Sequence, residues 1–270
     1  MAVYCRLHER CLELLSGADI LFRRPNRLDV CLVQNHPIAL VFLPASDIPS
    51  FVGKGNVDLG ITGHDVILES QMESFVTESL RLGFGKCALQ VQVPEAGSVQ
   101  SLDELAGKRI VTSFEVLAGR FFAEVDTRAG LTGDVRHTSI EYVGGSVEAA
   151  CALGLADGIV DLVESGETMR AAGLRPIATL LESEAVLIRS STPKHAHLAP
   201  LIDKITARIA GVIAARKYVI CQYNVLRAKL QTQRRSPRTA RPDYFPPGGP
   251  GLVSVGAEDI LIFNLDNSRV

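Results

Sequence analysis

Short apolar runs alternate with amphipathic segments along most of the chain. The apolar runs, bounded by Gly, Pro or Asn, predict strands at 28–33, 38–43, 88–93, 109–112, 139–143, 158–163, 177–181 and 185–188. Apolar residues at helical spacing predict helices at 7–16, 115–129 and 198–216, with shorter helices ending at Gly53 and beginning at Asp65 and Ser101. This alternation is typical of an α/β fold with a parallel or mixed sheet, in which ligands bind at the carboxyl ends of strands.

The alternation restarts near residue 91, and paired strands flank the segment that follows. Such strands could return the chain to the part where it began, which predicts two lobes with a ligand between them. We expect lobe I to hold 1–90 and 183–215, and lobe II to hold 91–182. From Lys217 the character changes, and residues 232–251, rich in Pro, Gly and Arg, are expected to be an unpacked insert.

The turn Glu164–Thr168 follows the apolar run 158–163 directly and is the clearest candidate for chemistry. Backbone N–H groups at a helix start, two hydroxyls and a glycine that permits close approach would together cradle a phosphate. Carboxylates beside such a site usually serve sugar hydroxyls or Mg²⁺. The pattern therefore indicates a phosphorylated-sugar site, although an ordinary strand–turn–helix with a Ser/Thr cap has the same residues.

A second polar segment lies at 57–65, where a short strand carrying Asp58 is expected to break into a Gly-flanked turn that contains Thr62. Asp58 could then cap the helix that follows.

Composition narrows the function classes. The formal charge of −2 gives no general attraction to nucleic acid or anionic membranes. The basic stretch 216–242 could bind an anion, but aromatic residues are not interleaved with its charges, so a solvated face is favoured. Six scattered cysteines without a C-x-x-C pair indicate reduced thiols, and no signal core or membrane-length apolar run is present. These features predict a cytoplasmic protein that binds neither nucleic acid nor membrane.

Three stretches in this order and spacing resemble the long-form ATP phosphoribosyltransferase family, the first enzyme of histidine biosynthesis. They are Val57–Gly63 (VDLGITG), Leu82–Cys87 (LGFGKC) and Gly145–Thr168. The segment Gly256–Leu265 (GAEDILIFNL) resembles the end of that family's regulatory domain. The similarity runs from about Arg6 to Arg269.

The resemblance implies a type II periplasmic-binding-protein-like core of two lobes and a ferredoxin-like, ACT-like regulatory domain at 216–270. It implies transfer of the phosphoribosyl group of phosphoribosyl pyrophosphate (PRPP) to N1 of ATP, with release of pyrophosphate. Mg²⁺ would be required, through substrate phosphates and at Asp161 if at any side chain. Histidine would act as a feedback inhibitor, and the chain would assemble as a homo-oligomer, a dimer or a hexamer.

The resemblance also implies roles for single residues. Loop amides and hydroxyls would hold the 5′-phosphate of PRPP, and two carboxylates would face the ribose hydroxyls or the metal. The implied catalytic and PRPP-loop residues are Asp161, Glu164, Ser165, Gly166, Glu167 and Thr168. On the other lobe Asp58 and Thr62 would line the cleft, and Arg6 would meet substrate phosphates unless it is only a surface charge.

The chain departs from the family pattern at two places. Only Met1–Cys5 precede Arg6, where the family has a strand and a Lys-containing, Gly-rich turn. Between Gln231 and Gly256 the Arg/Pro/Gly stretch replaces central strands of the regulatory unit, so we expect that domain to be incomplete and histidine inhibition to be weak or absent. Two alternatives remain: a PRPP-binding or regulatory paralogue with impaired turnover, and a solute-binding protein of the same fold, which the missing signal peptide disfavours.

Overall fold

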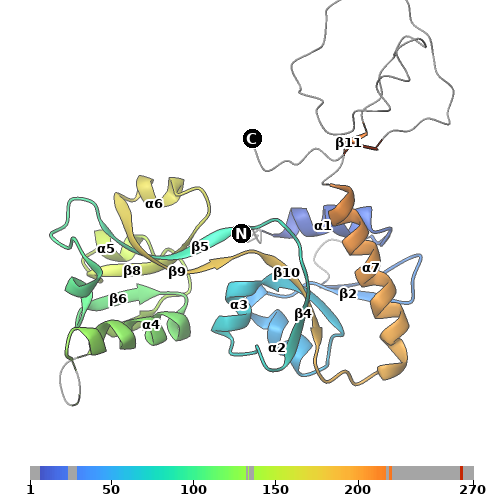
Figure 1. The fold of residues 1–270 in the computed structure, drawn as a ribbon, viewed down its shortest axis with the longest axis horizontal. Helices are drawn as coiled ribbons and strands as arrows, with labels where there is room; N and C mark the ends of the chain where they lie inside the picture. Colours follow the sequence, from blue (N-terminus) through green and yellow to red (C-terminus); the bar gives the residue numbers. More distant parts are fainter. Residues whose placement is uncertain are drawn as a thin grey trace, which may run out of the picture. The chain divides into compact units, whose positions relative to one another are not determined.

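The structure, a computed structural model, describes residues 7–23, 29–131, 133, 137–216, 219–220 and 262–263 (Figure 1). Contacts divide the chain into two units, Met1–Gly211 and Val212–Val270, with the boundary inside helix α7 (Ala199–Ala215). Beyond residue 216 the structure describes two short strands, β11 (Val219–Ile220) and β12 (Ile262–Phe263), which pair antiparallel. The other predictions for the regulatory region, and that for Arg6, lie outside the described residues.

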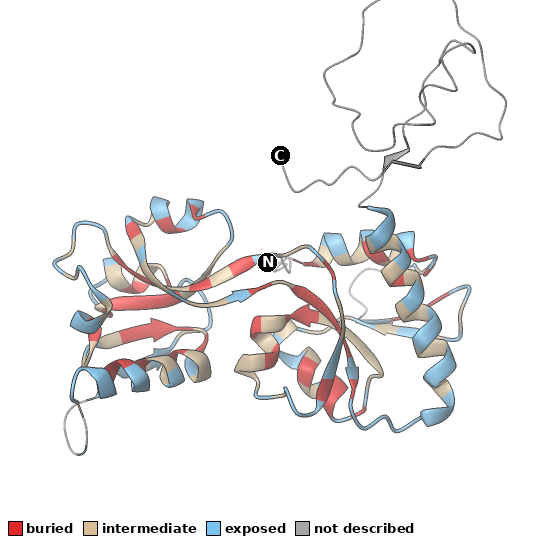
Figure 2. Cartoon of the chain, viewed as in Figure 1, coloured by how far each residue is buried: buried red, intermediate tan, exposed pale blue. Residues whose placement is uncertain are grey.

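Lobe I is built on a three-stranded antiparallel sheet in the order β3-β10-β4. The strand β10 lies in the centre, and its first four residues are buried (Figure 2). Helix α2 packs its Val52 against Ile188 of that strand in an apolar cluster. The elements before α7 are α1 (His8–Gly17), β1 (Val30–Leu32), β2 (Ala39–Val41), η1 (Ala45–Asp47), α2 (Ile48–Gly53), β3 (Leu59–Gly63), α3 (His64–Glu69) and β4 (Val76–Arg81), with β10 (Ala185–Ser190) and η3 (Ala196–Leu198) following lobe II.

Lobe II is a five-stranded mixed sheet in the order β7-β6-β8-β5-β9. Strand β6 runs parallel to β7 and β8, whereas β5 runs antiparallel to β8 and β9. Phe122 of helix α4 is 1% exposed and belongs to the main core of the lobe. The elements are β5 (Cys87–Pro94), η2 (Leu102–Leu105), β6 (Arg109–Thr112), α4 (Glu115–Arg128), β7 (Ser139–Tyr142), α5 (Ala149–Ala152), β8 (Gly158–Val163), α6 (Glu167–Ala171) and β9 (Leu174–Ser183).

Two neighbouring connections join the lobes. The chain passes from β4 to β5 through residues 82–86 and returns from β9 to β10 through Glu184. The connections pair with each other, because Cys87 lies opposite Ser183 and the Leu82 N–H donates to the Ala185 carbonyl (2.9 Å). The predicted α/β fold with two lobes of the type II binding-protein kind is therefore confirmed. The residue boundaries drawn for the domains stay a prediction.

The predicted Gly-flanked turn at 57–65 is wrong, because β3 continues through Thr62 to Gly63. Gly60 serves packing instead: a Cβ there would lie 2.7 Å from Ile48 and 2.8 Å from Val52 of helix α2. The glycine lets a helix approach the strand closely, and no reversal of the chain is needed.

The sequence pattern also missed strand β4. After Gly144 and Gly145 the chain forms one short helix, α5. Among the described residues no helix combines the length and apolarity needed to cross a membrane.

Candidate active site

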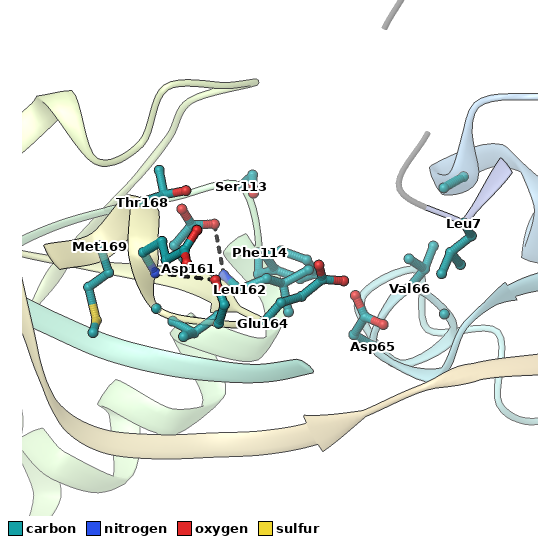
Figure 3. Close-up of a pocket in the computed structure, with 16 residues that line it drawn as sticks. Leu7, Asp65, Val66, Ser113, Phe114, Asp161, Leu162, Glu164, Thr168 and Met169 are labelled. Carbon is teal, nitrogen blue, oxygen red and sulfur yellow. Dashed lines mark hydrogen bonds between the residues drawn. The ribbon is translucent and has the colours of Figure 1, made fainter. Parts of the chain in front are cut away.

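A pocket of about 530 Å³ opens beside the end of strand β8 (Figure 3). Nine consecutive residues, Asp161–Met169, form one wall. Ser113 and Phe114, at the start of α4, extend that wall, and residues around the β3–α3 junction face it. The predicted loop therefore lies at the carboxyl end of a buried strand, where ligands bind in α/β proteins.

The loop after β8 turns at Gly166, which has a φ of 73° and precedes α6. The Glu167 N–H donates to Ser165 Oγ (3.4 Å), and Arg170 Nη2 donates to the Ser165 carbonyl oxygen (3.1 Å). These bonds close the turn upon itself. The next amides of the first helical turn, after that of Glu167, have no partner within the helix, so their N–H groups can donate to an anion.

Asp161 lies in β8 with its carboxylate at the pocket wall, where Oδ1 accepts the Leu162 N–H (2.8 Å; Figure 3). Burial raises the pKa of this carboxyl, the Leu162 N–H opposes that effect, and the charge of Glu148 adds to the rise. A carboxylate that is held partly out of water and beside an anion loop interacts strongly with a nearby cation. Asp161 is therefore suited to a bound metal or to positive charge that develops on a sugar.

Asp65 faces the loop from helix α3 and was missed in the sequence (Figure 3). Its side chain is 1% exposed, and Ser183 Oγ donates to its Oδ1 (2.5 Å) while its own N–H donates to Ser183 Oγ (3.0 Å). Ser183 ends β9, so these bonds join the pocket wall to the connection between the lobes. The signal in the sequence was an acidic residue in the first turn of a helix, just after Gly63.

The β6–α4 junction is held against β8 by one buried hydroxyl. Thr112 Oγ1 donates to the Val160 carbonyl oxygen (2.7 Å) and accepts the Phe114 N–H (2.9 Å). Thr112 is fully buried, so both bonds are shielded from water. They hold Ser113 and Phe114 beside the loop, where both residues line the pocket.

The structure does not bring Asp58 and Thr62 to this pocket. They line a second, mostly apolar pocket of about 460 Å³ in lobe I, which shares Leu7 and Ala45 with the first. Thr62 is fully buried, and its hydroxyl donates to the Ala45 carbonyl oxygen (3.4 Å). Within the described residues, the structure thus joins Asp161 to the loop but leaves the lobe I pair apart from them.

Four carboxylates border the first pocket, those of Asp65, Asp161, Glu164 and Glu167. Over the described part of the chain no cluster of three or more His, Cys, Asp or Glu side chains could by itself hold a metal ion. Mg²⁺ commonly takes one or two protein carboxylates and completes its octahedron with water and substrate phosphates. The donor set of the pocket fits an ion carried in with a phosphorylated substrate.

The fold and the pocket define a two-lobed α/β protein whose pocket lies beside a glycine-containing loop at the end of a buried strand. Comparison with known proteins makes the class specific. The family profile described as ATP phosphoribosyltransferase (HisG) matches residues 44–211. The chain is 50% identical over 285 residues to the ATP phosphoribosyltransferase of Yarrowia lipolytica, covering 98% of this chain and 94% of that protein.

The enzyme of the same name from Schizosaccharomyces pombe is 48% identical over 291 residues, with the same coverage of 98% and 94%. A chain of the ATP phosphoribosyl transferase (HisG:HisZ) complex from Thermotoga maritima superposes with a TM-score of 0.66 at 20% identity, over 79% of this chain and 96% of that one. The chain belongs to the ATP phosphoribosyltransferase family.

Proposed function

We propose that the pocket beside Glu164–Thr168 is the PRPP site of an ATP phosphoribosyltransferase, a pentosyltransferase that catalyses the first step of histidine biosynthesis. The observation that carries the proposal is the loop itself. A positive φ at Gly166, a closed turn and the start of helix α6 lie at the end of β8, beside a pocket large enough for a sugar phosphate.

In this reaction N1 of the adenine attacks the anomeric carbon of PRPP. The N1–C1′ bond forms while the bond from C1′ to pyrophosphate breaks, and its electron pair leaves with the pyrophosphate. The ribose becomes oxocarbenium-like, so positive charge grows on the sugar and negative charge on the leaving group. Such a step needs positioning and electrostatic stabilisation, and no protein nucleophile is required.

The amides of the loop, with Ser165 and Thr168, would hold the 5′-phosphate. Asp161 and Glu164 would face the ribose hydroxyls, where the partly buried carboxylate of Asp161 would favour a cationic sugar over a neutral one. Glu167 lines the same pocket. These assignments are the same as those predicted from the sequence. Their support is that the residues line one pocket.

Mg²⁺, when bound, would neutralise charge that develops on the departing pyrophosphate. Asp161 and Glu164 are the side chains that would help to hold it, together with the phosphates of PRPP. Asp161 has a spare carboxylate oxygen for this purpose, since Oδ1 is engaged by Leu162.

The ATP side of the site stays a proposal for Arg6, Asp58 and Thr62. Its support is that the pocket lined by Asp58 and Thr62 adjoins the PRPP pocket through Leu7 and Ala45. We also expect a homo-oligomer, as a dimer or hexamer, and a weak histidine response, because of the stretch that replaces part of the regulatory unit.

The test is a turnover assay of the full chain with ATP, PRPP, Mg²⁺ and pyrophosphatase, followed by the absorbance of phosphoribosyl-ATP. Thr168→Ala should weaken PRPP binding measured by calorimetry. Thr127→Ala is the matched control and should bind PRPP normally. The Thr127 hydroxyl donates to the Ala123 carbonyl oxygen of its own helix (2.8 Å), away from the pocket. Folded protein that neither binds PRPP nor turns over would refute the proposal. Binding without product would favour an impaired paralogue.

A further inference from the structure

Helix α4 starts without a cap of its own. Its N-cap residue, Phe114, makes no side-chain capping bond, and the first-turn amides would lack partners in an isolated helix. The missing acceptors come from the other lobe. Glu69, the last residue of α3, accepts the Val116 N–H at Oε1 (2.9 Å) and the Leu117 N–H at Oε2 (3.0 Å).

This contact combines hydrogen bonding with charge. Both carboxylate oxygens of Glu69 accept backbone N–H groups, and a negative group at a helix N-terminus also interacts favourably with the helix dipole. One turn further along α4, Arg120 Nη1 lies 3.9 Å from Glu73 Oε1. This second, exposed ion pair also attracts helix α4 towards lobe I. The exposed pair contributes little by comparison.

The two elements joined by Glu69 are opposite walls of the pocket. Helix α3 begins beside Gly63 and carries Asp65 and Val66, which line the pocket from lobe I. Helix α4 begins beside Ser113 and Phe114, which line it from lobe II. A bond between the end of α3 and the start of α4 therefore restrains the separation of these walls.

We propose that Glu69 is a positioning residue, which holds lobe I against helix α4 and so keeps the PRPP pocket at its binding width. In the described part of the chain the strand connections at 82–86 and Glu184 link the lobes covalently, and bending at such links changes the spacing of lobes. Without the carboxylate, conformations with separated walls become more populated. The apparent affinity for PRPP then falls in proportion to the fraction of molecules that remains competent to bind it.

The experiment compares wild type with Glu69→Ala and Glu69→Gln, using the full chain. Small-angle scattering without substrate reports the radius of gyration, calorimetry with PRPP and Mg²⁺ reports affinity, and steady-state assays separate KM from kcat. The matched control is Glu104→Ala, because Glu104 accepts two hydrogen bonds at a helix start within lobe II, from Ser101 Oγ (2.9 Å) and the Gln100 N–H (3.3 Å).

For Glu69→Ala we expect a larger radius of gyration and a Kd and KM for PRPP raised on the order of tenfold, with kcat nearly unchanged at saturation. Glu69→Gln keeps an acceptor oxygen but loses the charge, so its values should fall between wild type and Glu69→Ala. The Glu104→Ala control should match wild type in all three measurements.

The inference rests on the proposed function, yet each can fail separately. If wild type does not bind PRPP, the proposed site is wrong, and scattering alone still decides whether Glu69 restrains the lobes. If wild type binds PRPP while folded Glu69→Gln and Glu69→Ala keep its KM and its radius of gyration, Glu69 has no positioning role. A fall in kcat without any change in KM would overturn the inference as well.

Discussion

Replacing Gly166 by alanine tests the loop against a control that the same helix provides. Gly166 precedes α6 with a φ of 73°, and Gly173 follows the helix with a φ of 68°. A Cβ at Gly166 would lie 2.9 Å from Arg170 Nη1, whereas a Cβ at Gly173 would meet nothing within 4 Å. The two substitutions therefore share backbone strain but differ in contact with the pocket.

The strain has the same expected size at both positions. A left-handed conformation costs an L-residue about 1–2 kcal/mol relative to glycine. For a protein of this size that corresponds to a fall in Tm of roughly 2–4 °C. At Gly166 the guanidinium of Arg170 must also move, which breaks its bond to the Ser165 carbonyl oxygen (3.1 Å). That bond is exposed, so its loss adds about 1 kcal/mol or less to the cost.

The assay is thermal unfolding followed by calorimetry with PRPP and Mg²⁺. We expect both alanine variants to lose Tm to a similar degree, and Gly166→Ala alone to bind PRPP at least about tenfold more weakly, because the loop must rearrange to relieve the contact. Gly166→Val, with a branched side chain, should abolish binding. Wild-type affinity in Gly166→Ala would refute the cradle, and an unchanged Tm in both variants would refute the strain.

Three further predictions follow. Burial raises the pKa of Asp161, so ionisation of this carboxyl destabilises the fold as pH rises through the folded-state pKa. Asp161→Asn should therefore raise Tm at pH 7, and it should also remove turnover. Burial alone would raise the pKa of Asp126, but bonds from Thr138 and Gly107 outweigh it and lower the pKa, so this carboxylate stabilises the fold above its unfolded pKa. Asp126→Ala should cost about 3 kcal/mol in denaturant unfolding at pH 7, an effect that shrinks as pH falls through the folded pKa. Burial, with Asp157 adding, raises the pKa of Cys151 to about 11, so peptide mapping after iodoacetamide at pH 8 should find it alkylated only in denaturant.

Local patterns were enough to predict the strand and the turn at the centre of the proposed site. The apolar run 158–163 is β8, and the following turn has a positive φ at Gly166, which suits the proposed cradle. Both depend on residues that are close in sequence: apolar side chains for a buried strand, and a glycine where other residues are strained. The two-lobe fold was predictable for a related reason, since the order of strands and helices limits the topologies that a chain can adopt.

The tertiary structure decided which distant residues meet. Gly60 and Gly63 suggest a turn in the sequence, but helix α2 needs the space at Gly60, so the strand continues and Thr62 is buried. Asp65 is held at the pocket by a bond from Ser183, which returns from lobe II 118 residues further along the chain. Likewise, Glu69 accepts a hydrogen bond from the Val116 N–H of helix α4, which belongs to the other lobe.

The sequence by itself thus determined the loop, because its conformation depends on neighbouring residues alone. The wall that faces the loop was decided by strand pairing and helix packing between segments far apart in the chain. Such pairings depend on side-chain volume and on hydrogen bonds formed across the fold, which no short stretch of sequence specifies.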